Sequence, residues 1–215
     1  MRKLNMKPND THGLLITVCG LDGCGKTTMM NRIREEVFDK SKVFTTKQPT
    51  NHVRKSAIFR TYMDQPDHDA FDYRSLSLLA ASDRLQHVNK VIVPEMNKGK
   101  IVLSDRYYYS CLANLRARGF TDDMWIYEIA ESIIEPDIAF FFDVPVETAV
   151  ARVRQRPEEK DRYIDIDLQY KLREEYINIC KANNGVLIST ELPKEKCFKL
   201  IEEAIERKIF NGKNL

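Results

Sequence analysis

The sequence predicts a three-layer α/β sandwich, in which about five parallel strands form a sheet with helices on both faces. Short apolar runs of strand length alternate with longer helical patterns, which is typical of parallel strands joined by right-handed crossovers. The strands are apolar throughout instead of alternating, so both faces of the sheet should be covered. A chain of 215 residues with 43% hydrophobic residues suits one such domain, which we expect to span 1–215.

The first part of the chain supplies two strands and the helices next to them. Residues 14–19 form a continuous apolar run, which predicts a buried strand. Residues 27–38 place apolar residues at helical spacing among charges and predict a helix, whereas 42–46 predict a second, weaker strand. A short helix or turn is expected over 56–63, and a loop rich in Pro and Asp over 65–72.

The middle of the chain continues the same alternation. A long helical pattern spans 73–97, and an apolar run over 101–104 predicts the third strand. Helical spacing over 110–118 and 123–134 predicts two more helices, the second after a polar start signal. The apolar run over 138–143 has strand length and predicts the fourth strand.

The last part of the chain completes the sheet. Residues 146–155 predict a helix that leads into a strongly charged stretch. A helix over 167–183 is followed by a fifth strand over 186–189 and by a final amphipathic helix over 194–210.

Charge and cysteine usage exclude several classes of protein. Lys plus Arg is 34 and Asp plus Glu is 32, a balance that does not favour a nucleic-acid or membrane-surface binder. Residues 1–12 are polar, so we expect a flexible segment that is not a secretory signal, and no apolar run is long enough to span a membrane. The five cysteines form no C-x-x-C pair, which predicts reduced thiols in a cytoplasmic protein.

A complete phosphate-binding loop follows the first strand. Residues 20–28 read GLDGCGKTT and fit G-x-x-x-x-G-K-[ST], with a strand before and a helix after. The glycines let backbone N–H groups converge on a phosphate, Lys26 adds a positive charge, and Thr27 offers a hydroxyl to Mg²⁺. We therefore expect ATP to contact Gly20, Leu21, Asp22, Gly23, Cys24, Gly25, Lys26, Thr27 and Thr28.

A second candidate site follows the third strand, at the edge of the sheet where active sites of such folds lie. Asp105 stands at the strand end, where its carboxylate can hold Mg²⁺ directly or through water. Arg106 beside it can bridge two phosphates that repel each other. The alternative is a solvated Asp-Arg pair without chemistry.

Further motifs carry a resemblance to a known family. They are KQPT at 47–50, LLAASDRLQHV at 78–88, SDRYYYS at 104–110, and Asp143-Val144-Pro145 with Glu147 and Arg152. Together with the phosphate loop and its acidic Asp22, these motifs give the chain, over about 14–190, a sequence that resembles the thymidylate kinase family of P-loop nucleoside monophosphate kinases. Their order and spacing make the resemblance specific.

The resemblance implies roles for particular residues. Lys26, Arg106 and Asp22 would be catalytic, Arg60 would clamp the acceptor phosphate with Arg54 as second choice, and Arg84 would donate to a base carbonyl such as thymine O4. The implied acceptor site comprises Asp22, Pro49, Arg60, Arg84, Arg106, Ser110 and Asn114.

The resemblance also implies a mobile lid over about 152–165. Gly23 stands where one family subtype has a catalytic Arg, so that charge is expected from Arg152, Arg156 or Arg162, with Arg156 ranked first. Arg152 is also expected at the ATP site. The alternative is a solvated charged loop.

Two departures put the identity of the acceptor in question. The family usually has an aromatic residue where this chain has Ala80, and a Tyr where it has Asn114. A ring from Tyr107, Tyr108 or Tyr109 is the alternative that would restore normal selectivity. The phosphoryl-transfer residues are not affected by these changes.

The sequence as a whole therefore predicts the reaction ATP + dTMP ⇌ ADP + dTDP. The expected partners are small-molecule nucleotides, without nucleic acid or membrane, and the resemblance implies a homodimer. One alternative is a kinase of the same fold for another or a modified (ribo)nucleotide acceptor. The other is a non-kinase P-loop regulatory protein, which the presence of Arg60, Arg84 and Arg106 disfavours.

Overall fold

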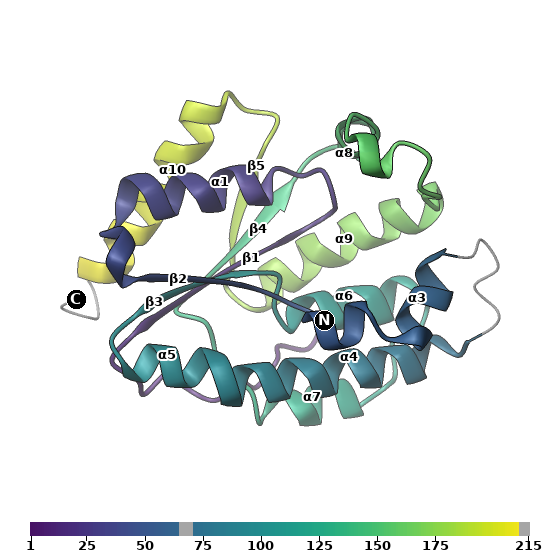
Figure 1. Ribbon diagram of the computed structural model, residues 1–215, viewed down its shortest axis with the longest axis horizontal. Helices are drawn as coiled ribbons and strands as arrows, with labels where there is room; N and C mark the ends of the chain where they lie inside the picture. Colours follow the sequence, from purple (N-terminus) through teal and green to yellow (C-terminus); the bar gives the residue numbers. More distant parts are fainter. Residues whose placement is uncertain (65–70, 211–215) are drawn as a thin grey trace.

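The computed structural model describes residues 1–64 and 71–210, so most of the loop expected over 65–72 lies outside the described residues. Within them, five parallel strands form one sheet with helices on both faces, which confirms the predicted three-layer α/β sandwich (Figure 1). The strands are β1 (Leu14–Gly20), β2 (Val43–Lys47), β3 (Ile101–Asp105), β4 (Ile138–Asp143) and β5 (Val186–Ser189).

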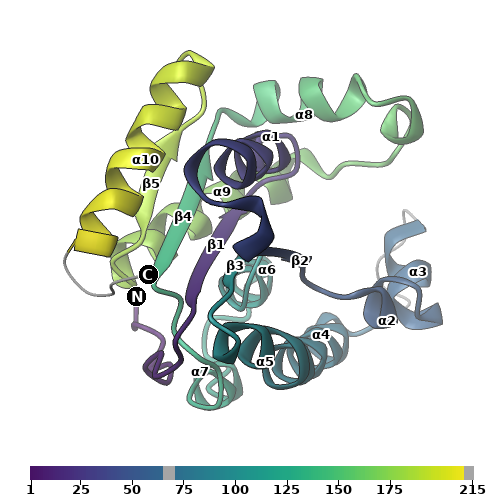
Figure 2. The ribbon, with the colours of Figure 1, turned by 60° about the vertical axis from the view of Figure 1, so that its left-hand side comes forward.

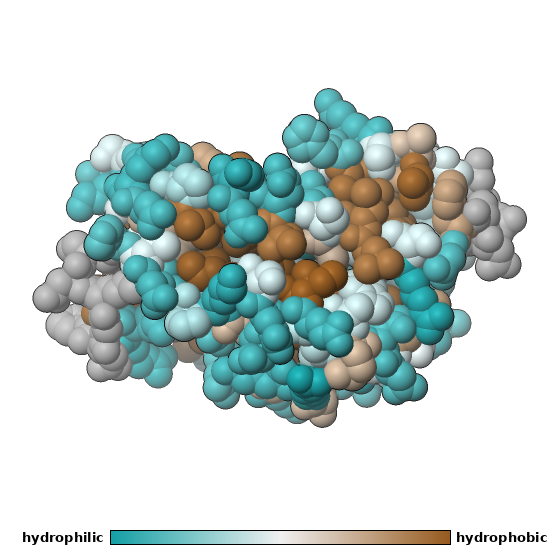
Figure 3. All heavy atoms as spheres, turned by 90° about the horizontal axis from the view of Figure 1, so that it is seen from below, coloured by the Kyte–Doolittle hydropathy of each residue, from teal (hydrophilic) through white to brown (hydrophobic). Residues whose placement is uncertain are grey.

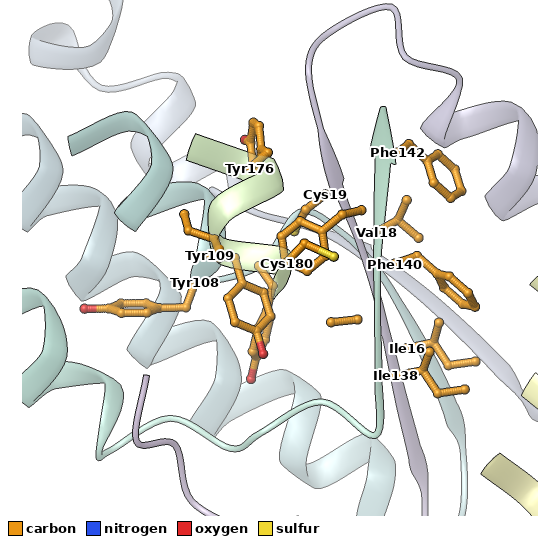
Figure 4. Packing of buried hydrophobic residues seen from close by; sticks show 14 of the residues in the cluster. Ile16, Val18, Cys19, Tyr108, Tyr109, Ile138, Phe140, Phe142, Tyr176 and Cys180 are labelled. Atoms are coloured by element: carbon orange, nitrogen blue, oxygen red, sulfur yellow. The ribbon is translucent and has the colours of Figure 1, made fainter. Parts of the chain in front are cut away.

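The strand order is β2-β3-β1-β4-β5, which places β1 at the centre. Leu14 of β1 lies opposite Ile101 of β3, and Ile16 lies opposite Ile138 of β4. Figure 4 shows Ile16, Ile138 and Phe140 packed together beside these strands. Because helices cover both faces, nearly every residue of β1, β3 and β4 is buried, and this burial explains their continuous apolar sequence.

The main helices form two layers. On one face α1 (Lys26–Arg32) lies beside α10 (Lys194–Phe210), and Arg32 joins them by donating to Glu195 at 2.9 Å (Figure 2). On the other face α4 (Tyr73–His87), α6 (Tyr109–Ala117) and α9 (Ile166–Ala182) pack in a row. The remaining α-helices are α2 (Asn51–Arg54), α3 (Ala57–Asp64), α5 (Val93–Asn97), α7 (Trp125–Ala130) and α8 (Val146–Arg154).

Most differences between the predicted and the observed helix boundaries come from π-helical and 3₁₀-helical turns. The predicted helix over 73–97 is continuous, but Val88–Ile92 forms a π-helical segment between α4 and α5. Pro94 follows at the start of α5, and its missing N–H and bulky ring disturb the preceding hydrogen bonds. A second π-helical segment, Ile33–Val37, completes the helix predicted over 27–38. Short 3₁₀ turns span Lys40–Lys42 and Pro157–Glu159.

The N-terminal segment differs from the flexible segment that its polar composition predicts. Leu4 and Met6 are buried in the core. Lys7 pairs with the chain at 133–135, where its N–H donates to Ile133 at 2.8 Å and its carbonyl accepts from Glu135 at 2.6 Å. The same pairing shortens the helix predicted over 123–134, because the chain leaves the helix to meet this segment.

One face of the molecule carries a broad apolar area. Seen from below, hydrophobic residues gather in a band across the middle of the molecule, with hydrophilic residues around it (Figure 3). Among the described residues, no helix combines the length and the apolar character needed to cross a membrane.

Candidate active site

A cleft of about 780 Å³ opens at the carboxyl ends of the central strands. The loops after β1, β2 and β3 all contribute to its lining, through Leu21 and Asp22, Pro49, and Arg106 respectively. Residues of α3, α4, α6, α9 and the lid form its walls. The topology therefore brings the phosphate loop, the second candidate site and the charged lid to one cavity.

The phosphate loop begins where β1 ends and closes on the first turn of α1. Lys26 is buried, and its ammonium group donates to the carbonyls of Gly20 at 3.2 Å and Leu21 at 2.6 Å. Gly23 has a φ of +84°, and a Cβ there would lie 2.2 Å from the carbonyl oxygen of Ala149. The close approach of α8 thus excludes a side chain at position 23, including the Arg that one family subtype carries.

Asp22 joins the loop to two arginines. One carboxylate oxygen accepts from Arg106 at 2.6 Å and the other from Arg162 of the lid at 3.1 Å. Burial favours a raised pKa for Asp22, but the charges of Arg106, Lys26 and Arg162 outweigh burial and hold this pKa well below its usual range. Asp22 is therefore a fixed anion among three cations.

Arg106 adopts an uncommon backbone conformation for a residue with a side chain, with a φ of +69°. Its N–H donates to Val18 at 2.8 Å, which ties the end of β3 to β1. Its guanidinium also donates to the Gly20 carbonyl at 3.2 Å and to the Tyr176 hydroxyl at 2.8 Å. These contacts hold the charge of Arg106 between the phosphate loop and the acceptor side of the cleft.

The candidate metal ligands retain the donor atoms that a hard cation needs. The Oδ1 atom of Asp105 is buried and has no hydrogen-bond partner among the described residues, while Oδ2 lies 3.1 Å from the ammonium of Lys47. Thr27 lies on the first turn of α1 with an exposed side chain. An orphaned carboxylate oxygen and an accessible hydroxyl fit Mg²⁺.

Three arginines predicted at the acceptor site line the cleft. Arg54 donates to the Pro49 carbonyl at 2.7 Å, and its pKa is lowered by burial and by the nearby charge of Arg106. Arg60 is more exposed and lies on α3. Arg84 is only 4% exposed and donates to the carbonyls of Tyr107 at 3.3 Å and Ala80 at 3.0 Å.

Helix α4 also fixes the loop after β2, through residues to which sequence reasoning gave no role. Asp83 accepts from the N–H of Thr50 at 2.7 Å and from its hydroxyl. The ring nitrogens of His87 lie 2.9 Å from the Thr46 hydroxyl and 3.1 Å from the Gln48 amide nitrogen. Burial lowers the pKa of His87, which favours the neutral form of the ring.

The lid arginines occupy different positions. Arg162 donates to Asp22 at 3.1 Å and to Glu159 at 2.7 Å, whereas Arg156 pairs with Glu159 at 2.9 Å and its side chain is 47% exposed. Both line the cleft. Arg152 lies behind the phosphate loop, where it donates to the carbonyls of Gly23 at 3.4 Å and Thr190 at 3.2 Å.

Comparison with known proteins shows the family to which this chain belongs. The family model described as thymidylate kinase matches residues 18–201. The chain belongs to the thymidylate kinase family. A probable thymidylate kinase of Pyrococcus horikoshii is 34% identical over 172 residues, 79% of this chain and 83% of that protein. A probable thymidylate kinase of Thermococcus gammatolerans is 29% identical over 208 residues, 93% and 99% of the two chains.

The similarity extends to a more distant relative. The thymidylate kinase of Lactobacillus acidophilus is 28% identical over 207 residues, which covers 92% of this chain and 95% of that protein. The predicted family is thereby confirmed, and the chain is a nucleotide kinase that uses ATP.

The aromatic rings of the cleft come from residues that sequence reasoning missed. Tyr107 and Tyr108 point into the core, where their hydroxyls donate to Ile134 at 2.7 Å and Ile126 at 2.8 Å. Tyr109 is also buried in the core (Figure 4). Rings that line the cleft instead include Tyr62 on α3 and Tyr73 on α4.

A sequence signal for one of these rings exists. Tyr73 precedes Arg84 by eleven residues, or about three turns, so both lie on one face of α4. In this thymidylate kinase family member, Asn114 donates to the Ser110 carbonyl at 2.9 Å and accepts from Arg118 at 3.1 Å. Arg118 is a further cleft residue that the motif comparison did not contain.

Proposed function

We propose that this protein transfers the γ-phosphoryl group of ATP to dTMP and releases ADP and dTDP. The observation that carries the proposal is the continuity of the cleft. It runs from Asp22 beside the phosphate loop, past Arg106, to Arg84 on α4. A donor phosphate at one end and an acceptor nucleotide at the other would therefore meet at Arg106.

Catalysis in this proposal rests on positioning and on fixed charge, without a covalent intermediate. Lys26 neutralises the β- and γ-phosphates, and Arg106 draws the donor and acceptor phosphates together. Arg162 supplies the lid charge, because it already reaches the phosphate loop through Asp22. Closure of the lid excludes water, which would otherwise hydrolyse ATP.

Mg²⁺ is the proposed metal, with Thr27 and Asp105 as the residues that would hold it. The ion would neutralise charge on the transferring phosphoryl group. The buried Oδ1 atom of Asp105, which has no hydrogen-bond partner within the described part of the chain, supports this choice. Lys47 balances the charge of the same carboxylate on its other oxygen.

The proposed acceptor site has a cationic end and a base-binding end. Arg54 and Arg106 bind the acceptor phosphate, because Arg54 is anchored on Pro49 close to the charge of Arg106. Arg60 is the second candidate for this contact. Arg84 donates to a carbonyl of the base, since a guanidinium offers donors only.

A coupled assay of ADP release tests the proposal. ATP should be consumed when dTMP is present, and dTMP should be a better acceptor than dAMP, dGMP or dCMP. Lys26→Ala is the negative control, and the surface variant Lys98→Ala is the matched positive control because Lys98 is exposed and its ammonium pairs with Glu95, away from the cleft. ATP hydrolysis that no nucleotide monophosphate stimulates would instead support the regulatory P-loop alternative.

We also propose a homodimer in the cytoplasm. The apolar band in Figure 3 and the exposed side chains of Leu78 and Met124, at 45% and 47%, support a subunit contact. Five free, buried cysteines suit a reducing compartment. Light scattering should give twice the mass of one chain. Leu78→Glu should lower the measured mass if α4 lies in the subunit contact. A monomer at micromolar concentration would contradict the proposal.

A further inference from the structure

Arg118 lies in the acceptor cleft inside a cluster of polar and aromatic side chains. Its Nη1 atom donates to the Asn114 carbonyl at 3.0 Å and to the side-chain oxygen of Asn114 at 3.1 Å, and its Nε atom donates to the Tyr62 hydroxyl at 2.8 Å. The guanidinium carbon lies 3.9 Å from the centre of the Tyr73 ring. The cluster therefore joins α3, α4 and α6 where they come together (Figure 1).

The guanidinium of Arg118 is held in place, but not all of its N–H donors have a hydrogen-bond partner within the described part of the chain. Its Nη2 group has no hydrogen-bond partner among residues 1–64 and 71–210, although the side chain is half-buried. Tyr62 and Tyr73 cover it, with their ring centres 5.4 Å apart. The two rings already exclude part of the water around the N–H donors of Nη2. An oxygen atom that accepts a hydrogen bond from these donors would therefore be bound favourably.

The position of the cluster along α4 sets it apart from the base-reading Arg84. Tyr73, Ser77, Ala80 and Arg84 line one face of the cleft. The Arg84 side chain runs back along α4 and donates to the Ala80 carbonyl. About 10 Å of helix lies between Ala80 and Tyr73. Leu76, Ser77 and Ala80 line the cleft within this interval of α4, and the small Ser77 and Ala80 side chains leave room beside a base that Arg84 holds.

Resting on the proposed kinase function, we infer that Arg118 is a specificity-determining residue. It hydrogen-bonds an oxygen on a substituent of the acceptor's pyrimidine base, such as the hydroxyl of a hydroxymethyl group on C5. C5 neighbours C4, whose carbonyl Arg84 would hold, so its substituent has room to extend past Ala80. Thymine carries only a methyl group there and leaves the Nη2 donors of Arg118 unpaired.

The test compares two acceptors that differ by a single oxygen, dTMP and 5-hydroxymethyl-dUMP, in the ADP-release assay. Wild-type enzyme should use 5-hydroxymethyl-dUMP at least as well as dTMP, judged by kcat/KM. Arg118→Met keeps the length of the side chain and removes its donors. It should lower kcat/KM for 5-hydroxymethyl-dUMP about 10-fold or more, and that for dTMP less than about threefold.

Two further variants keep the test sharp. Tyr62→Phe removes only the hydroxyl that accepts from Arg118, so it should shift the same ratio in the same direction with the fold intact. Arg74→Met is the matched control, because Arg74 also covers a ring, that of Phe120 at 4.6 Å, and pairs with Asp123, yet does not line the cleft. It should leave the ratio unchanged.

The outcomes separate this inference from the proposed function. Equal losses with both acceptors, or no loss with either, would overturn the role of Arg118 while dTMP turnover upholds the kinase function. A selective loss with UMP over dUMP would overturn the base assignment in favour of a sugar hydroxyl. Absence of turnover with every acceptor in wild-type enzyme would refute the proposed function and this inference together.

Discussion

The carboxylate of Asp22 in the phosphate loop accepts a hydrogen bond from Arg162 of the lid at 3.1 Å. This contact spans 140 residues of sequence and joins the phosphate loop to the charged segment after α8 that we predict to be a lid. The same carboxylate also accepts from Arg106, so the phosphate loop, the residue after β3 and the predicted lid meet at one anion. The distribution of charge around Asp22 leads to the first two predictions.

Lys26→Ala should lower kcat at least about 100-fold, because the ammonium stabilises negative charge on the phosphoryl group during its transfer. Its ammonium group donates to two loop carbonyls and the Cys24 sulfur, and these hydrogen bonds lie within the phosphate loop, so the fold should survive. Steady-state kinetics and circular dichroism of the purified variant provide the measurement. Turnover close to that of wild type would contradict this role.

Arg162→Ala should reduce kcat far more than Arg156→Ala, with a smaller change in the KM for the acceptor. Both arginines pair with Glu159, and within the described part of the chain Arg162 but not Arg156 also contacts Asp22 of the phosphate loop. We expect a loss of at least about 100-fold for Arg162→Ala. A larger loss in Arg156→Ala would restore the assignment that the sequence alone ranks first.

Gly23→Ala should destabilise the protein by more than about 3 kcal/mol, because the new Cβ would meet the Ala149 carbonyl at 2.2 Å. Gly119→Ala is the matched control. Its φ is also positive, at +90°, but a Cβ there meets nothing within 4 Å, so only the conformational cost of about 1 kcal/mol applies. Urea denaturation of both variants gives the two costs, and equal values would show that α8 yields to the side chain.

Acid should weaken the fold in part through His87. Burial lowers the pKa of His87 in the folded state, so the unfolded chain takes up a proton first as pH falls below about 6.5. The free energy of unfolding should be greatest above that pH and fall with acidification. His87→Gln should flatten this dependence between about pH 7.5 and about pH 5.5, measured by urea denaturation.

The control for this prediction is His52→Gln, since His52 is exposed. It should retain the wild-type slope of stability against pH. A His87→Gln variant with an unchanged slope would show that protonation of other groups accounts for acid sensitivity. The absolute stability of His87→Gln is not informative, because the substitution also alters the bonds to Thr46 and Gln48.

The sequence by itself determined the features that depend on local pattern. Continuous apolar runs identified β1, β3 and β4 within one residue, because burial on both faces leaves a clear local signature. The phosphate loop followed from its motif, since the spacing of its glycines and Lys26 is itself the geometry that binds phosphate. Arg84 and Arg106 were found because short motifs surround them.

Only the tertiary structure decided how distant segments meet. Composition predicted a flexible start of the chain, yet Leu4 is buried and donates to Asn183, and Lys7 pairs with the chain near 133–135. Motifs could not tell that Arg162 reaches Asp22, or that Arg118 stacks on Tyr73. Those contacts depend on the path of the lid and on the packing of α3, α4 and α6, which no local spacing encodes.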